Sequence, residues 1–144
     1  MMIRHTRDTL SPVYLDALKI RHLVFVEGQG VPLRIEIDEN EALCIHFVLY
    51  DDQDRPLATC RLLPQNDRQV LLQRMAVLPD YQGQALGSQL LKEASQFAKE
   101  LGYEEISLHA QVSAQTFYQK LGYSSFGDLF EEAGIQHIHM KKRL

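Results

Sequence analysis

The segment at residues 72–92 constrains the fold most, because it reads as a buried strand that runs through a glycine-containing loop into a helix. Residues 70–78 are apolar and β-branched enough for a buried strand, and from Leu86 apolar residues recur at helical spacing until Gly102. The loop at residues 82–87 therefore precedes a helix. Its small residues let a ligand approach the backbone, and the free N–H groups of the first turn suit an anion such as a pyrophosphate.

Two common phosphate-binding loops do not match this segment. A Walker loop ends in Gly-Lys-Ser/Thr, and that ending is absent here. A dinucleotide-binding fingerprint has its glycines early in a βαβ unit, whereas Gly83 and Gly87 follow more than half of the chain. An ordinary tight turn between strand and helix remains an alternative for the loop taken alone.

Two motifs together resemble the GCN5-related N-acetyltransferase (GNAT) superfamily. The family's pyrophosphate loop has the pattern Arg/Gln-x-x-Gly-x-Gly/Ala, in which Gln82 and Gly87 match and Ala85 replaces a usual glycine. The segment A-Q-T-F-Y-Q-K-L-G-Y at residues 114–123 is similar to the family's second signature, whose tyrosine stands near the sulfur of coenzyme A. The chain is close in pattern to the bacterial ElaA/YjcF-like and glyphosate N-acetyltransferase-like branches.

The resemblance implies an α/β (α+β) acyl-CoA N-acyltransferase fold over essentially the whole chain. Its central sheet is mixed and mostly antiparallel, it splays between the fourth and fifth strands, and helices cover both faces. Ser11 followed by a proline is a typical helix start. The expected elements are a strand at residues 2–7, a helix at 12–24, a mobile acidic loop at 33–43, strands at 45–50, 57–63 and 70–78, a helix from 86, a strand at 103–110, a helix over 114–121, and closing strands.

Composition limits the class of protein. A chain of 144 residues and 16.6 kDa suits a single domain at residues 1–144, and no apolar run reaches membrane length. A formal net charge of −4 argues against a nucleic-acid partner. The N-terminus lacks a secretory signal, so we expect a cytoplasmic protein in which Cys44 and Cys60 are reduced, buried thiols.

The resemblance implies acetyl-CoA as the cosubstrate and direct attack of a small-molecule primary amine on its thioester. Tyr118 matches the tyrosine that protonates the departing thiolate, and His137 matches a histidine base in the last strand of the glyphosate N-acetyltransferase branch. A strand histidine that merely packs is the alternative for His137. His139 and His109 have no such match, and a zinc site is not expected because further ligands are lacking.

The resemblance also implies cofactor contacts from the strand before the loop, from the loop itself, and from two later positions. These residues are Met75, Ala76, Val77, Gln82, Gly83, Gln84, Ala85, Leu86, Gly87, Ser88, Gln111 and Phe117. Family members often form homodimers, but no stretch of this sequence identifies an interface.

Arg21 and Arg74 match arginines that hold an anionic group on the acceptor, which predicts an amino-acid-like substrate. Gln111 stands where that branch has a third arginine. A competing interpretation is that the acidic residues at 36–41 attract a cationic amine or polyamine, or are simply solvated. A non-catalytic acyl-CoA-binding sensor or interaction module remains open from the sequence.

Overall fold

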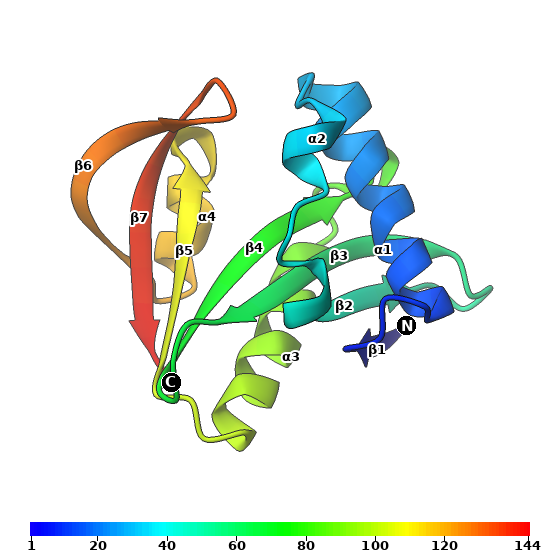
Figure 1. Cartoon of the computed structure of the whole chain (residues 1–144), viewed down its shortest axis with the longest axis horizontal. Helices are drawn as coiled ribbons and strands as arrows, with labels where there is room; N and C mark the ends of the chain where they lie inside the picture. Colours follow the sequence, from blue (N-terminus) through cyan, green and yellow to red (C-terminus); the bar gives the residue numbers. More distant parts are fainter.

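The computed structural model describes residues 1–144 and contains one seven-stranded sheet in the order β1-β2-β3-β4-β5-β7-β6 (Figure 1). Only the β4–β5 pair is parallel, and all other neighbours are antiparallel. The strands are β1 (Met2–Thr6), β2 (Ile45–Tyr50), β3 (Pro56–Pro64), β4 (Gln69–Val77), β5 (Glu105–Gln111), β6 (Ser124–Glu132) and β7 (Ile135–Arg143). The expected mixed, mostly antiparallel sheet is confirmed.

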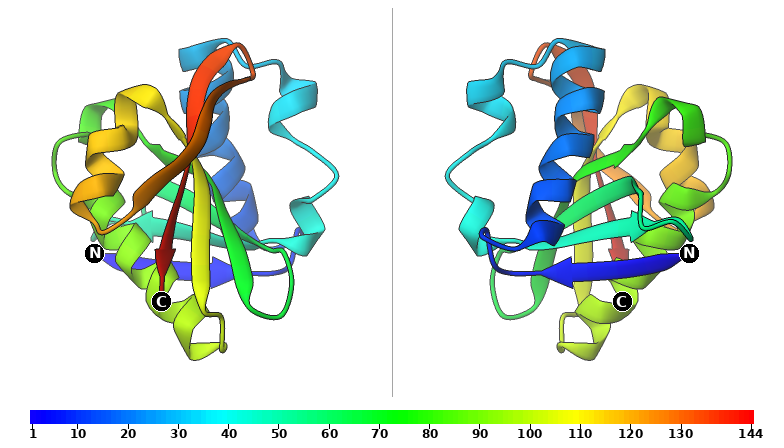
Figure 2. Two further views of the ribbon diagram at one scale, coloured as in Figure 1. Left: turned by 90° about the vertical axis from the view of Figure 1, so that its left-hand side faces the viewer. Right: turned by 90° about the vertical axis from the view of Figure 1, so that its right-hand side faces the viewer.

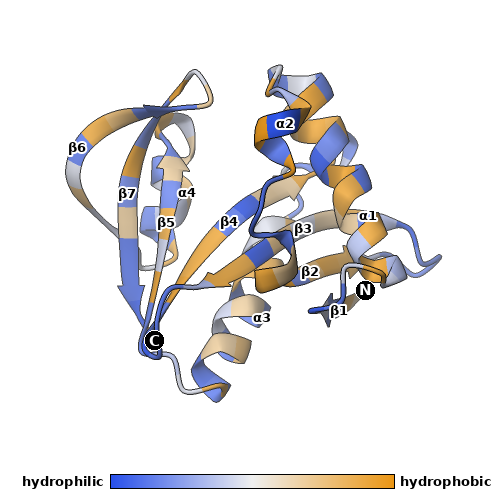
Figure 3. Cartoon of the chain, viewed as in Figure 1, coloured by the Kyte–Doolittle hydropathy of each residue, from blue (hydrophilic) through white to orange (hydrophobic).

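Helices lie on both faces of the sheet, and for this reason β2 is buried on both sides. Phe47 and its alternate neighbours pack with α3, whereas Val48 and Tyr50 pack with α1. Figure 2 shows the arrangement of these two helices about the sheet. Hydrophobic and hydrophilic residues alternate along α1, as Figure 3 shows. The longer helical segments are α1 (Pro12–Arg21), the π-helix η1 (His22–Glu27), α2 (Leu33–Glu36), α3 (Leu86–Glu100) and α4 (Gln115–Lys120), with short 3-10 turns η2 (Glu41–Leu43), η3 (Pro79–Tyr81) and η4 (Val112–Ala114).

The two parallel strands separate along their length. They pair from Gln69 opposite Glu105 only as far as Leu72 opposite Leu108, and they then diverge toward their carboxyl ends (Figure 1). On its other side, β4 carries a bulge against β3, where Arg74 adopts a left-handed φ of 57°. A bulge bends its strand locally, and the expected splay between the fourth and fifth strands is confirmed.

The first helix begins as predicted, because the Ser11 hydroxyl accepts a hydrogen bond from the Val13 amide at 3.2 Å. Helical backbone continues as a π-helix to Glu27, beyond the predicted end at residue 24. The predicted mobile loop at residues 33–43 contains α2 and η2. Cys44 and Cys60 are buried and unbonded, and none of the helices combines the length and apolarity that a membrane span requires.

Candidate active site

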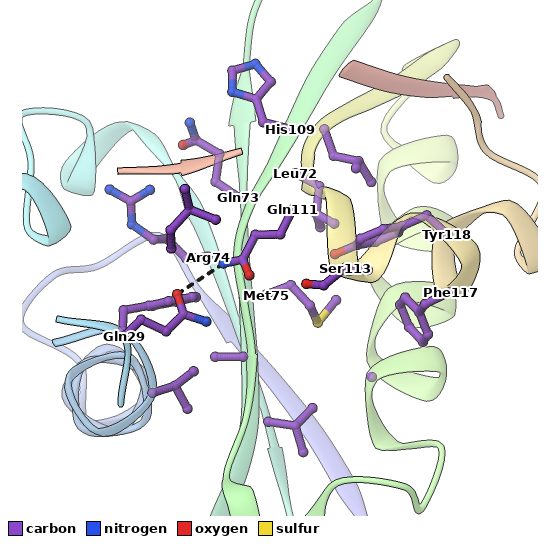
Figure 4. Close-up of a pocket in the computed structure, with 18 of the residues that line it drawn as sticks. Gln29, Leu72, Gln73, Arg74, Met75, His109, Gln111, Ser113, Phe117 and Tyr118 are labelled. Carbon is purple, nitrogen blue, oxygen red and sulfur yellow. Dashed lines mark hydrogen bonds between the residues drawn. The ribbon is translucent and has the colours of Figure 1, made fainter. Parts of the chain in front are cut away.

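A cavity of about 890 Å³ opens where β4 and β5 diverge (Figure 4). Its wall combines the end of β4, the start of α3, the end of β5, α4, the β6–β7 hairpin, and the η1–α2 segment. Most of the predicted site residues line this cavity. They are Arg74, Met75, Ala76, Val77, Gln82, Gly83, Ala85, Leu86, Gly87, Ser88, Gln111, Phe117, Tyr118 and His137. Arg21 and Gln84 do not line it.

The loop before α3 presents backbone N–H groups to one end of the cavity. Ala85 occupies the N-cap position with a left-handed φ of 61°, where an alanine costs about 1 kcal/mol relative to glycine. No side chain caps this helix, and its first turn contains no acidic residue. The free amides and the positive end of the helix dipole therefore suit the pyrophosphate of a nucleotide cofactor.

The open edge of β4 lies beside this loop. Beyond Leu72 the edge that faces β5 has no strand partner, and Met75, Ala76 and Val77 line the cavity there. An exposed strand edge binds extended, amide-containing chains through its backbone groups. The loop and the edge together fit a ligand that carries a pyrophosphate and an amide-linked arm, as coenzyme A does.

Tyr118 projects from α4 toward the gap between the two strands, close to Ser113 and Met75 (Figure 4). The side chain is only 7% exposed and its ring packs edge-on against Phe117. Burial raises the pKa of the Tyr118 hydroxyl well above its ordinary value. The group therefore stays protonated at neutral pH and can act as a hydrogen-bond donor or a proton donor.

A cluster of His109, Glu132 and His137 lines the other end of the cavity. Glu132 Oε1 accepts a hydrogen bond from His109 Nδ1 at 3.0 Å, and Glu132 Oε2 lies 3.6 Å from His137 Nε2. His137 Nδ1 donates to the Ile135 carbonyl at 2.7 Å. Glu132 was not identified from the sequence. His109, which the sequence placed in the strand beside the cofactor gap as a structural residue, lines the cavity. That position was the only signal in the sequence for His109.

The hydrogen bond from His109 lowers the pKa of Glu132, and the charges of His109, His137 and Arg74 act in the same direction against partial burial. Glu132 is therefore an ionised carboxylate at neutral pH. Because His109 uses its Nδ1 to bond Glu132 and His137 uses its Nδ1 to bond the Ile135 carbonyl, both rings have defined orientations.

The structure corrects the prediction that Arg21 contacts the acceptor. Its side chain is 1% exposed and donates to Glu36 and, at 2.7 Å, to Glu41. Buried arginines require such partners, because an uncompensated charge in the interior is costly. Arg21 is therefore not a substrate ligand, and it is not exposed to solvent either.

The acidic segment at residues 36–41 was expected either to attract a cationic amine or to be solvated, and the structure shows a different arrangement. Glu36 and Glu41 are buried, and Arg61 on β3, a residue not identified from the sequence, donates to both Glu41 and Asp38 at 2.8 Å. These carboxylates pair with internal arginines. Only Glu36 and Asp38 reach the cavity wall, and Glu41 does not.

Two further side chains define the middle of the cavity. Arg74 lines the wall, but its Nε and Nη2 donate to the carbonyls of Ile35 and Glu36 and to Asp38. Gln111, predicted to contact the cofactor, donates to Gln29 Oε1 at 3.0 Å across the cavity (Figure 4). That hydrogen bond connects the end of β5 to the segment after η1.

Comparisons with known proteins agree with this geometry. A family model described as an acetyltransferase (GNAT) domain matches residues 32–144. The uncharacterized N-acetyltransferase YjcF of Bacillus subtilis is 35% identical over 128 residues, which cover 88% of this chain and 90% of YjcF.

Solved structures extend the similarity over nearly the whole chain. Escherichia coli ElaA superimposes with a TM-score of 0.86 at 26% identity, covering 99% of each chain. An acyl-CoA N-acyltransferase from Pseudomonas aeruginosa gives a TM-score of 0.86 at 27% identity, again over 99% of each chain. The protein therefore belongs to the GNAT family and is an acetyl-CoA-dependent N-acetyltransferase.

Proposed function

We propose that this enzyme acetylates the primary amine of a small molecule by direct attack on acetyl-CoA in a ternary complex. Tyr118 acts as the acid and His137 as the base. The observation that carries the proposal is that one cavity is lined both by a buried, protonated tyrosine and by a histidine whose ring orientation is held by the Ile135 carbonyl.

The hydrogen bond of His137 supports its role as the base. The Ile135 carbonyl only accepts hydrogen bonds, so His137 Nδ1 carries a proton. In the neutral ring Nε2 then holds the lone pair, and this is the nitrogen near Glu132. An acceptor ammonium bound there loses its proton to Nε2 and becomes the nucleophile.

The transfer then needs no enzyme nucleophile. The amine nitrogen attacks the thioester carbon, a C–N bond forms, and the negative charge moves to the carbonyl oxygen. Backbone amides at the open edge of β4 are suitable donors to that oxygen. The intermediate collapses as the C–S bond breaks, and the Tyr118 hydroxyl gives its proton to the sulfur. The amide nitrogen releases its second proton to solvent, from which the Tyr118 oxygen regains a proton.

The predicted cofactor residues divide between two parts of acetyl-CoA in this proposal. Gln82, Gly83 and the residues at 85–88 surround the pyrophosphate, and Met75, Ala76 and Val77 hold the amide-linked arm. Phe117 packs beside the arm. Gln84 has no contact with the cavity, and Gln111 reaches the cofactor only if it exchanges its hydrogen bond with Gln29.

The test measures release of the coenzyme A thiol from acetyl-CoA with a panel of primary amines. We expect wild-type turnover, and we expect Tyr118→Phe to lower kcat by about tenfold or more with little change in KM for acetyl-CoA. Tyr123→Phe is the matched control, since Tyr123 packs 5.8 Å from the Tyr118 ring but does not line the cavity. Turnover of Tyr118→Phe equal to that of Tyr123→Phe would reject the acid role.

A further inference from the structure

We infer that Glu132 binds the acceptor's ammonium group and that the enzyme selects cationic amines without a neighbouring carboxylate. This inference rests on the proposed function, because it assumes that the amine enters the end of the cavity where His137 lies. It replaces the anionic acceptor that Arg21 and Arg74 suggested from the sequence.

The first argument is that two hydrogen-bond acceptors face each other. Glu132 Oε1 is occupied by His109, which leaves Oε2 for a ligand. In neutral His137 the proton is on Nδ1, so Nε2 is also an acceptor, and it lies 3.6 Å from Oε2. Neither atom has another hydrogen-bond partner within the chain. A primary ammonium has N–H donors for both atoms, so it fits between them and is aligned to give one proton to Nε2.

The second argument concerns charge. The arginines near the cavity are already paired with an equal set of carboxylates, in a cluster that comprises Arg21, Arg61, Arg74, Glu36, Asp38 and Glu41. Glu132, in contrast, has only histidine neighbours within ion-pair distance. When both histidines are neutral, the Glu132 carboxylate is an unpaired negative charge at the acceptor end, which attracts a cation and repels a substrate carboxylate.

The third argument is the apolar wall opposite Glu132. Four apolar side chains line this wall of the same cavity. They are Val24 and Phe25 from η1, Val31 just before α2, and Ile35 within α2. The β6–β7 hairpin and α2 lie on opposite sides of the open end of the sheet (Figure 1). A hydrocarbon chain or ring that carries the amine gains free energy by covering these side chains, and a carboxylate beside the amine does not.

The experiment compares amines with their α-carboxylated counterparts, using cadaverine with lysine, tyramine with tyrosine, and histamine with histidine. Each pair shares a side chain and differs only in the carboxylate. We expect wild-type kcat/KM to favour the amine by about tenfold or more in each pair. Equal values would overturn the inference while acetyl transfer itself stands. A preference for the amino acids would overturn it as well and would assign their carboxylate to Arg74.

The variant Glu132→Gln keeps an oxygen that can accept from His109 but removes the charge. We expect KM for the amines to rise about tenfold, the preference over amino acids to shrink, and KM for acetyl-CoA to stay unchanged. Glu131→Gln is the control, because Glu131 is the exposed neighbour on the same strand and lies outside the cavity. Equal behaviour of the two variants would overturn the inference.

The same assay separates this inference from the proposed function. If no amine in any pair is acetylated although acetyl-CoA still raises the melting temperature, small-molecule transfer is wrong, and the role of Glu132 falls with it. If amines and amino acids are both acetylated without discrimination, only the role of Glu132 is wrong.

Discussion

At the scale of single residues, the hydrogen bond from His137 to the Ile135 carbonyl determines which ring nitrogen is available for chemistry. Proton removal from the acceptor requires a lone pair that faces the cavity, and this bond leaves that lone pair on Nε2. His139 lies two residues further along the same strand and on the same face, but it stacks against Phe126 and Phe130 and does not line the cavity.

This difference gives a direct prediction. His137→Ala should lower kcat by on the order of a hundredfold, the usual reach of a general base, and should remove the acidic limb of the pH–rate profile. His139→Ala should leave both the rate and the profile close to those of wild type. Steady-state rates from pH 5 to 9 test this, and a His137→Ala profile that matches wild type would limit His137 to a packing role.

At the scale of elements, the start of α3 is the proposed binding site for the pyrophosphate. Gly87 lies in its first turn, where an added Cβ would be 3.4 Å from Phe117 Cζ and 3.7 Å from Val77 Cγ2. A glycine at this position therefore keeps the cavity open next to the free amides. A longer, negatively charged side chain would fill the space and repel a pyrophosphate.

We expect acetyl-CoA to raise the melting temperature of the wild type, as any ligand that binds only the folded state does. Gly87→Glu should abolish this shift. Gln89→Glu, which adds the same charge on the exposed side of the same helix, should retain most of it. Differential scanning fluorimetry at millimolar acetyl-CoA tests the pair, and a full shift in Gly87→Glu would place the cofactor elsewhere.

At the scale of the whole molecule, the buried ion pairs join parts of the chain that are distant in sequence. Arg21 on α1 and Arg61 on β3 both donate to Glu41, which precedes β2. Burial by itself would raise the pKa of Glu41, but hydrogen bonding and charge from Arg21, with the charge of Arg61, lower it well below its ordinary value. The carboxylate is therefore ionised in the folded protein over a wider pH range than in the unfolded chain.

The sign of the pH effect follows from this lowered pKa. Glu41 contributes its full stabilisation above the unfolded pKa of about 4.3, and the contribution is lost as pH falls from there toward the lower folded pKa. Glu41→Gln should cost about 3–5 kcal/mol at pH 7, because it leaves buried arginines without a charged partner. Its free energy of unfolding should then decline less steeply than that of wild type below about pH 4.3.

Urea unfolding at pH 7 and at pH 4 measures both effects. Glu93→Gln on the exposed surface of α3 is the control and should change little at either pH. A Glu41→Gln variant with wild-type stability at pH 7 would show that the ion pairs add no net stability.

The sequence by itself determined the features that depend on neighbouring residues. Local backbone preferences and hydrophobic periodicity predict three of these features. They are the N-cap at Ser11, the hairpin of β2 and β3, and the strand, loop and helix around Gly83. Tyr118 was singled out because most of its motif, residues 114–123, lies in the short helix α4. Interactions between residues that are close in sequence can be predicted from the order of those residues.

The tertiary structure alone decided what each charged side chain does. Arg21 meets Glu36 and Glu41 across a loop, and Glu132 meets His109 from another strand, 23 residues away. A local sequence pattern does not predict such ion pairs and hydrogen bonds. A charged side chain in a folded protein pairs with whichever opposite charge the packing and the strand order place within a few ångströms. For that reason the strand, loop and helix around Gly83 could be predicted from the sequence, whereas the charges that line the other end of the cavity depend on how the sheet assembles.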